Sequence, residues 1–141
     1  MRIKYFDKDY PRLERIEGQK SDWIDLRSRE TISLEKGQFY LIPLGVAIEL
    51  PKGYEAIVAP RSSAFKHWGF LVVNSIGVID ESYCGDEDEW LLAVYATRDA
   101  VINKYDRICQ FRLFEHQPYF GFEEVETLGN KSRGGHGSTG V

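Results

Sequence analysis

The chain has 141 residues, of which 43% are hydrophobic, and a formal net charge of -4 at pH 7. A chain of this size can bury enough apolar surface to fold as one domain without disulfides, and its composition is that of a globular protein. The acidic balance argues against a nucleic-acid-binding protein, which needs a basic surface to neutralise phosphates.

Membrane and secretory functions are also disfavoured. No apolar run approaches the roughly 18 residues of a membrane span, and residues 1–6 alternate like a strand instead of forming a signal peptide. Cys84 and Cys109 lie far apart in the chain, which favours reduced thiols in a cytoplasmic protein. Three scattered histidines lack the spacing of a zinc site.

Strand patterns and turn signals follow one another along most of the chain. The turn signals recur about every ten residues, which predicts an all-β sandwich or barrel. Pro43 predicts a bend or an edge within the longest apolar run. Residues 7–20 and 98–104 are expected to be connections, the first with weak helical character. The expected strands are 1–6, 31–34, 39–50, 54–59, 70–75, 90–97, 105–114 and 120–125.

Two segments in the first half carry polar groups suited to phosphate chemistry. Asp25 is an isolated carboxylate among apolar residues, although a strand-end Asp that faces water explains it equally well. In Pro60-Arg61-Ser62-Ser63, two hydroxyls stand at an expected helix start, where backbone N–H groups favour an anion. Arg61 adds a forked donor for phosphate oxygens. The alternative is an ordinary serine N-cap.

The segment 77–85 is the most suggestive. An apolar run delivers Asp80, and then come a turn, Tyr83 and Gly85. This pattern predicts a hairpin whose backbone edge faces a flat ligand, with Asp80 beside it and Tyr83 beneath it. A simpler interpretation makes Asp80 a turn-forming residue.

Two further segments have unusual composition. Residues 86–89 are all acidic and are most simply a solvated hairpin tip. Residues 128–141 are rich in glycine, hydroxyls and cations. Such an end is either a frayed terminus or a flexible arm that wraps a phosphate chain.

Taken in order, the segments at Asp25, 60–63, 77–85, 106–110 and 128–141 resemble the five motifs of the trimeric dUTP pyrophosphatases (dUTPases). The resemblance runs from about Asp22 to the C-terminus. It is strongest in four places, which are Gly77-Val78-Ile79-Asp80 with Tyr83 and Gly85, Pro60-Arg61-Ser62, Asp106-Arg107-Ile108-Cys109-Gln110, and Gly137-Ser138-Thr139-Gly140.

The resemblance implies an all-β, distorted jelly-roll β-barrel with one short helix. Residues 1–126 would form this domain and residues 127–141 a flexible C-terminal arm that closes over the nucleotide. The subunits would assemble as a homotrimer with shared active sites. The reaction would convert dUTP to dUMP and pyrophosphate with Mg²⁺, limiting uracil in DNA and supplying dUMP for thymidylate synthesis.

The resemblance also implies residue roles. Asp80 would be the general base, and Tyr83 would pack under the deoxyribose and refuse a 2′-hydroxyl. Asp25 would hold a water of the Mg²⁺ shell. The remaining substrate contacts would be Asn74, Gly77 and Ile79 for uracil, Arg61, Ser62, Ser63 and Gln110 for phosphates, and Lys131, Arg133, Gly135, His136, Gly137, Ser138 and Thr139 in the arm.

Several positions depart from the family pattern. Ile24 and Tyr105 stand where small residues are usual, Ser63 replaces a glycine, and Lys131 takes an arginine slot. His136 occupies the slot of the phenylalanine that stacks on uracil. We therefore expect another aromatic, Trp90 or a neighbour, to help cover the base, with a buried core role for Trp90 as the alternative.

Two other functions compete with hydrolysis of dUTP. A dCTP deaminase of the same fold is similar at 60–63, but it expects an arginine where this chain has Lys66 and a glutamate where 91–95 has no carboxylate. A dUTPase-like trimer that binds a regulatory protein is the other alternative, with the acidic 86–89 tip as its expected contact.

Overall fold

The computed structural model describes residues 1–15, 21–137 and 139–140. The secondary structure in these ranges is almost entirely strand, which confirms the all-β prediction with one short helix. None of the helical residues in these ranges forms a helix long and apolar enough to cross a membrane. The elements are β1 (Arg2–Tyr5), β2 (Ile24–Arg27), β3 (Ile32–Leu34), β4 (Phe39–Pro43), β5 (Val46–Glu49), β6 (Tyr54–Pro60), α1 (Ala64–Trp68), β7 (Phe70–Val72), β8 (Gly77–Ile79), β9 (Leu91–Ala96), β10 (Ala100–Ile102) and β11 (Arg107–Glu115).

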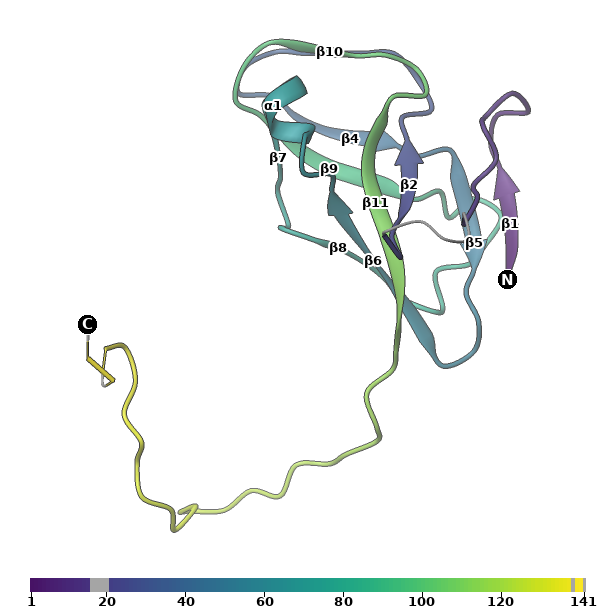
Figure 1. Cartoon of the computed structure of the whole chain (residues 1–141). Coiled ribbons are helices and arrows are strands. Elements are labelled where there is room, and N and C mark those ends of the chain that lie inside the picture. The colour runs from purple at the N-terminus through teal and green to yellow at the C-terminus, as the bar shows by residue number, and fades with distance from the viewer. Residues whose placement is uncertain (16–20, 138, 141) are drawn as a thin grey trace.

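The strands form two main sheets with antiparallel neighbours. One has the order β2-β11-β6-β8 and the other the order β4-β9-β7, while β1 pairs with β5 and β10 with β3. Figure 1 shows the strands of the two main sheets crossing one another. The core lies between them, and the buried Trp90 and Phe111 rings meet edge to face there, with centroids 5.2 Å apart.

Alternation along the strands decides which side chains enter this core. In β9 the inward residues Leu92, Val94 and Ala96 are buried. The outward residues of the same sheet are also apolar, yet they stay exposed in the single chain. They are Phe39, Leu41, Leu71, Leu91 and Tyr95, each between 42% and 56% exposed. We call these five residues the outer apolar face.

The long apolar run 39–50 divides directly after Pro43, close to the predicted bend. Gly45 takes a positive φ of 73° at the break. A Cβ built on Gly45 would come within 2.8 Å of the Tyr10 ring. The glycine therefore provides both the turn and the room for Tyr10.

The segment 7–20 is expected to be a connection, and its described residues up to 15 do connect β1 to β2. The expected weak helical character is wrong, because these residues contain no helix. Tyr10 is only 2% exposed. Its hydroxyl accepts the N–H of Arg27 (2.8 Å) and donates to the carbonyl of Arg27 (3.1 Å). A segment of polar composition is thus fastened to β2 by one aromatic side chain.

Two other strand assignments are wrong. The expected connection 98–104 contains β10, which pairs with β3. The expected strand 120–125 has no strand partner, and the chain after β11 extends away from the body (Figure 1). Tyr119 and Phe122 are almost fully exposed there. Alternating apolar residues form a strand only where another strand is present to pair with them.

Candidate active site

The strand β8 forms the edge of its sheet. It pairs with β6 through Gly77↔Val58 and Ile79↔Ala56, and as the last strand in the sheet order it leaves its other edge unpaired. A Cβ on Gly77 would lie 3.3 Å from the Val58 side chain, so the glycine allows close packing. The predicted backbone edge is therefore present. The predicted hairpin is wrong, because residues 80–90 form turns and then enter β9 in the other sheet.

Asp80 follows this edge directly and is exposed. Its Oδ1 accepts the N–H of Ser82 (2.8 Å) and the Ser82 hydroxyl (2.6 Å). These two bonds lower the pKa of Asp80, with the hydroxyl contributing most. Asp80 is thus a turn-forming residue, as the simpler interpretation predicted, and also an ionised carboxylate whose Oδ2 has no hydrogen bond from the described residues.

Tyr83 lies across the same loop. Its backbone N–H donates to the carbonyl of Asp80 (3.0 Å), and its hydroxyl donates to the carbonyl of Glu89 (3.0 Å). Burial raises the pKa of the Tyr83 phenol, so the ring stays neutral. With 37% of its surface exposed, Tyr83 presents an aromatic surface close to Asp80.

A second polar group lies where β6 ends. The Asp25 carboxylate on β2 is held between two guanidinium groups, with Oδ1 3.1 Å from Arg61 Nε and Oδ2 3.2 Å from Arg107 Nη1. The Gln110 amide donates to the carbonyl of Pro60 (3.3 Å). The structure therefore brings together three predicted site residues, Asp25, Arg61 and Gln110. Arg107 is a fourth member to which the sequence alone gave no role.

The serines after Arg61 are not ordinary caps. Ser63 occupies the N-cap position of α1, but its side chain makes no capping hydrogen bond. The turn is closed by backbone bonds instead, from Ala64 N–H to the Arg61 carbonyl and from His67 N–H to the Ser63 carbonyl. The N-cap alternative therefore does not explain the Ser63 hydroxyl.

These two groups lie at opposite ends of β6. Ile79 pairs with Ala56, and Arg61 follows five positions later. At about 3.3 Å per residue, roughly 16 Å of strand separates them. Asn74 lies in the exposed turn between β7 and β8, before the end of β8 that pairs with Val58. A single chain thus carries two half-sites, which we call the Asp80 half-site and the Asp25 half-site.

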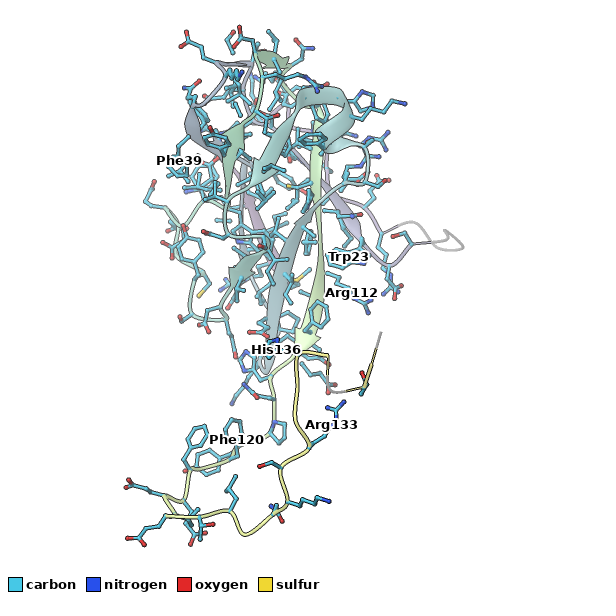
Figure 2. All side chains as sticks on the ribbon, turned by 90° about the vertical axis from the view of Figure 1, so that its left-hand side faces the viewer. Trp23, Phe39, Arg112, Phe120, Arg133 and His136 are labelled. Atoms are coloured by element: carbon cyan, nitrogen blue, oxygen red, sulfur yellow. The ribbon has the colours of Figure 1, made fainter. Side chains whose placement is uncertain are left out.

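The predicted arm residues join neither half-site within this chain. In the described residues beyond His116, no hydrogen bond reaches the body. Figure 2 shows Arg133 on the arm, and Phe120 in the segment between β11 and the arm, apart from the sheets. The described arm positions in the predicted site are Lys131, Arg133, Gly135, His136, Gly137 and Thr139, and Ser138 lies outside the described residues.

Trp90 does not cover a base, so that hypothesis is wrong and the core alternative is confirmed. Its side chain is 0% exposed and packs on Phe111. The solvated acidic tip is wrong in part as well. Asp86 and Glu87 are exposed, but Glu89 is half-buried and ion-paired with Arg29 at 2.7 Å.

Asp25 suits only an indirect role toward a metal. In the described part of the chain, no group of three or more His, Cys, Asp or Glu residues could hold a metal ion. Both Asp25 oxygens already bind guanidinium groups. A carboxylate has about four lone-pair sites, so each oxygen retains capacity to accept from metal-bound water. Mg²⁺ commonly keeps several waters and binds through substrate phosphates.

Comparison with known proteins extends this picture. The dUTPase family model matches residues 17–140. The SPbeta prophage-derived deoxyuridine 5'-triphosphate nucleotidohydrolase YosS of Bacillus subtilis (strain 168) is 54% identical over 141 residues, covering 100% of this chain and 98% of the relative. The chain belongs to the dUTPase family. This membership favours a dUTPase over the dCTP deaminase alternative.

Solved dUTPases share the fold. The dUTPase of Staphylococcus bacteriophage 80alpha, in a mutant form with dUpNHpp, superposes with a TM-score of 0.80 at 21% identity, covering 99% of this chain and 98% of that one. A dUTPase of S. aureus phage phi11, which coordinates a structural Mg(II) ion, gives a TM-score of 0.76 at 17% identity, covering 90% and 97%. The fold is therefore of the dUTPase jelly-roll type, although in the described residues hydrogen-bonded strands do not close a barrel.

Proposed function

We propose that this protein hydrolyses dUTP to dUMP and pyrophosphate, with Asp80 as the general base. The observation that carries the proposal is an exposed, ionised carboxylate next to the unpaired edge of β8. Asp80 would take a proton from a water molecule whose oxygen bonds to the α-phosphorus. The bond from that phosphorus to the leaving pyrophosphate would break. A weak base serves here only if the water is well positioned.

Uracil recognition is assigned to the edge of β8. The unpaired N–H and C=O groups around Gly77 and Ile79 suit the alternating donors and acceptors of a pyrimidine edge. Asn74, whose amide offers both donors and an acceptor, would assist from the preceding turn. Tyr83 would lie under the deoxyribose and leave no room for a 2′-hydroxyl.

The Asp25 half-site is assigned to the phosphates. Arg61 supplies a forked donor, Ser62 and Ser63 supply hydroxyls, and Gln110 supplies an amide. Asp25 orients Arg61 and would accept from waters of a Mg²⁺ ion. When bound, Mg²⁺ would neutralise phosphate charge.

The separation of the half-sites supports a homotrimer with shared active sites. One nucleotide cannot place its α-phosphate at Asp80 and its β- and γ-phosphates at Arg61 of the same chain when about 16 Å of strand lies between these two residues. The outer apolar face also leaves five large side chains in contact with solvent, as is common for a surface that another subunit covers. Closed cyclic assemblies place different parts of identical chains side by side.

The arm would complete the site from another subunit. Its Leu128 is exposed here, and its cations Lys131 and Arg133 contact no acidic group in the described part of the chain. Residues 127–141, including His136, Ser138 and Thr139, would close over the nucleotide bound to the 1–126 domain. Closure would exclude bulk water from the reaction.

Two further assignments remain proposals. A cytoplasmic location is supported by an exposed free thiol at Cys84. A regulatory protein partner stays a prediction, and its expected contact is reduced to Asp86 and Glu87, because the side chains of Asp88 and Glu89 are occupied within the fold.

The experiment that tests the function is pyrophosphate release from dUTP, dTTP, UTP and dCTP, with and without Mg²⁺. We expect release from dUTP alone among the four, and dependence on Mg²⁺. Ammonia release from dCTP, or no product from dUTP, would overturn the assignment.

A further inference from the structure

The Tyr83 ring is held at two points. Its backbone N–H is bound to the Asp80 carbonyl, and its hydroxyl to the Glu89 carbonyl, each at 3.0 Å. The loop between these points also makes a short-range bond from the Gly85 N–H to the Asp88 carboxylate (2.7 Å) and longer-range bonds from Lys4 Nζ to the Asp86 carbonyl (2.7 Å) and from the Gly53 N–H to the Glu81 carboxylate (3.2 Å). The Tyr83 side chain itself hydrogen-bonds to the Glu89 carbonyl, so the position of this carbonyl sets the position of the ring.

Glu89 is fixed by its own side chain. Oε1 accepts from Arg29 Nε (2.7 Å) and from the Gly45 N–H (2.9 Å), and Oε2 accepts from Arg29 Nη2 (3.2 Å). The Glu89 side chain is only 14% exposed. A two-pronged guanidinium–carboxylate pair with this little solvent fixes direction as well as distance.

Arg29 and the residue after Glu89 are themselves held by backbone hydrogen bonds. The N–H of Arg29 donates to the Pro43 carbonyl (2.9 Å). On the other side, Trp90 donates its N–H to the Val46 carbonyl (2.8 Å), and its carbonyl accepts from Leu44 (2.9 Å). The Glu89 carbonyl thus stands between a side-chain anchor and a backbone anchor on the turn from β4 to β5.

We propose that Glu89, held by Arg29, is a positioning residue that sets the height of Tyr83 and thereby the selection of deoxyribose over ribose. The inference rests on the proposed role of Tyr83 under the sugar. Rejection of one hydroxyl requires a wall placed to within about 0.5 Å. The Arg29–Glu89 pair transmits the position of the β4–β5 turn to that wall, although neither side chain contacts the nucleotide.

The test is the ratio of kcat/KM for dUTP to kcat/KM for UTP. We expect Glu89→Ala and Arg29→Ala each to lower this ratio on the order of tenfold, because a displaced ring admits the 2′-hydroxyl. A merely structural role would reduce the amount of active enzyme, which scales both rates equally and leaves the ratio unchanged. Glu89→Gln, whose amide oxygen still accepts from Gly45, should retain most of the selectivity.

Glu87→Ala is the matched control. Glu87 is an acidic residue of the same loop, but its side chain is 90% exposed. Its Oε1 lies 3.9 Å from Lys4 Nζ, so the pair is loose and open to solvent. We expect its ratio to equal that of the wild type.

An unchanged ratio in folded Glu89→Ala overturns the inference. If that variant does not fold, Arg29→Lys decides, since it keeps the side-chain length and charge. A ratio lowered about threefold in Arg29→Lys, which cannot form the two-pronged pair, supports the inference, and a wild-type ratio in this variant overturns it. Failure of the wild type to hydrolyse dUTP would instead refute the proposed function.

Discussion

The two half-sites treat an isolated aspartate in opposite ways. Asp80 is bound on one oxygen by the neutral donors of Ser82, and its other oxygen has no partner among the described residues. Asp25 is enclosed by the positive charges of Arg61 and Arg107, one on each oxygen. Two aspartate carboxylates therefore differ in the charge of their partners and in the oxygen atoms that they leave unbound.

The contrast shows which carboxylate is available to take a proton. Neutral hydrogen bonds keep Asp80 ionised and aimed while leaving lone pairs for water. Two guanidinium groups make Asp25 a structural counter-ion that orients donors for phosphate. Substitutions at four positions test this division of roles, and their expected effects decrease in the order Asp80, Trp90, Arg61 and Ser82.

Asp80→Asn should remove the base and keep the turn. Asparagine forms the same local turn with Ser82, so thermal stability should change little while kcat for dUTP falls by about 10²–10⁴. Steady-state pyrophosphate release and a melting curve measure the two effects. Activity within threefold of the wild type would show that Asp80 is not the general base.

Trp90→Ala should destabilise the core between the two main sheets without removing a contact to the nucleotide. Loss of a fully buried indole costs about 3–5 kcal/mol of unfolding free energy, whereas KM for dUTP in the folded fraction should stay the same. Denaturant unfolding and initial rates report these quantities.

Trp90→Phe is the matched control. The Trp90 Nε1 has no hydrogen-bond partner among the described residues, so phenylalanine removes an unsatisfied donor and should cost much less stability. A raised KM in Trp90→Phe would return Trp90 to the nucleotide site.

Arg61→Ala should weaken the Asp25 half-site. The loss of charge-assisted hydrogen bonds to phosphate, about 1.5–3 kcal/mol, corresponds to roughly 10–100-fold in kcat/KM. Arg61→Lys should recover only part of this, since an ammonium cannot bind Asp25 and a phosphate with one planar fork. An unchanged kcat/KM in Arg61→Ala would show that this half-site takes no part in the reaction.

Ser82→Ala should change the pH dependence of kcat/KM for dUTP. Ser82 lowers the pKa of Asp80 by donating to the carboxylate. Removing the hydroxyl raises that pKa, so Asp80 becomes protonated at a higher pH and the acid limb of kcat/KM moves upward. Rates at neutral pH should change little. Ser33→Ala, an exposed serine on β3, is the control that should leave the profile unchanged.

The turn around Asp80 and Tyr83 could be predicted because its signals are local. An apolar strand, a turn-forming Asp and a closing glycine all lie within nine positions. The hairpin was predicted wrongly because the destination of the chain after the turn depends on packing. After Trp90 the chain enters β9 of the opposite sheet, and no short-range pattern reveals this.

The anchor at Glu89 could not be predicted for a similar reason. Glu89 ends a run of four acidic residues and looks like its neighbours in sequence. Its burial depends on Arg29, which lies 60 positions earlier. An ion pair between distant segments leaves no periodic signal in either one.

Tyr105 shows where a departure from the family pattern is accommodated by structure. It takes a positive φ of 70°, which favours glycine. Its hydroxyl donates to Asp7 (2.6 Å), and its ring packs edge to face on Tyr10. These contacts with the N-terminal segment hold a conformation that most side chains disfavour.

The most direct test of the shared site is to mix two impaired chains that carry different substitutions. Asp80→Asn and Arg61→Ala subunits would be unfolded, combined in equal amounts and refolded together. If each site takes Asp80 and Arg61 from different subunits, about one quarter of sites regain both residues, and dUTP hydrolysis returns to about that share of wild type. A mixture no more active than the average of its two components would show that both residues act from one chain, which contradicts the account.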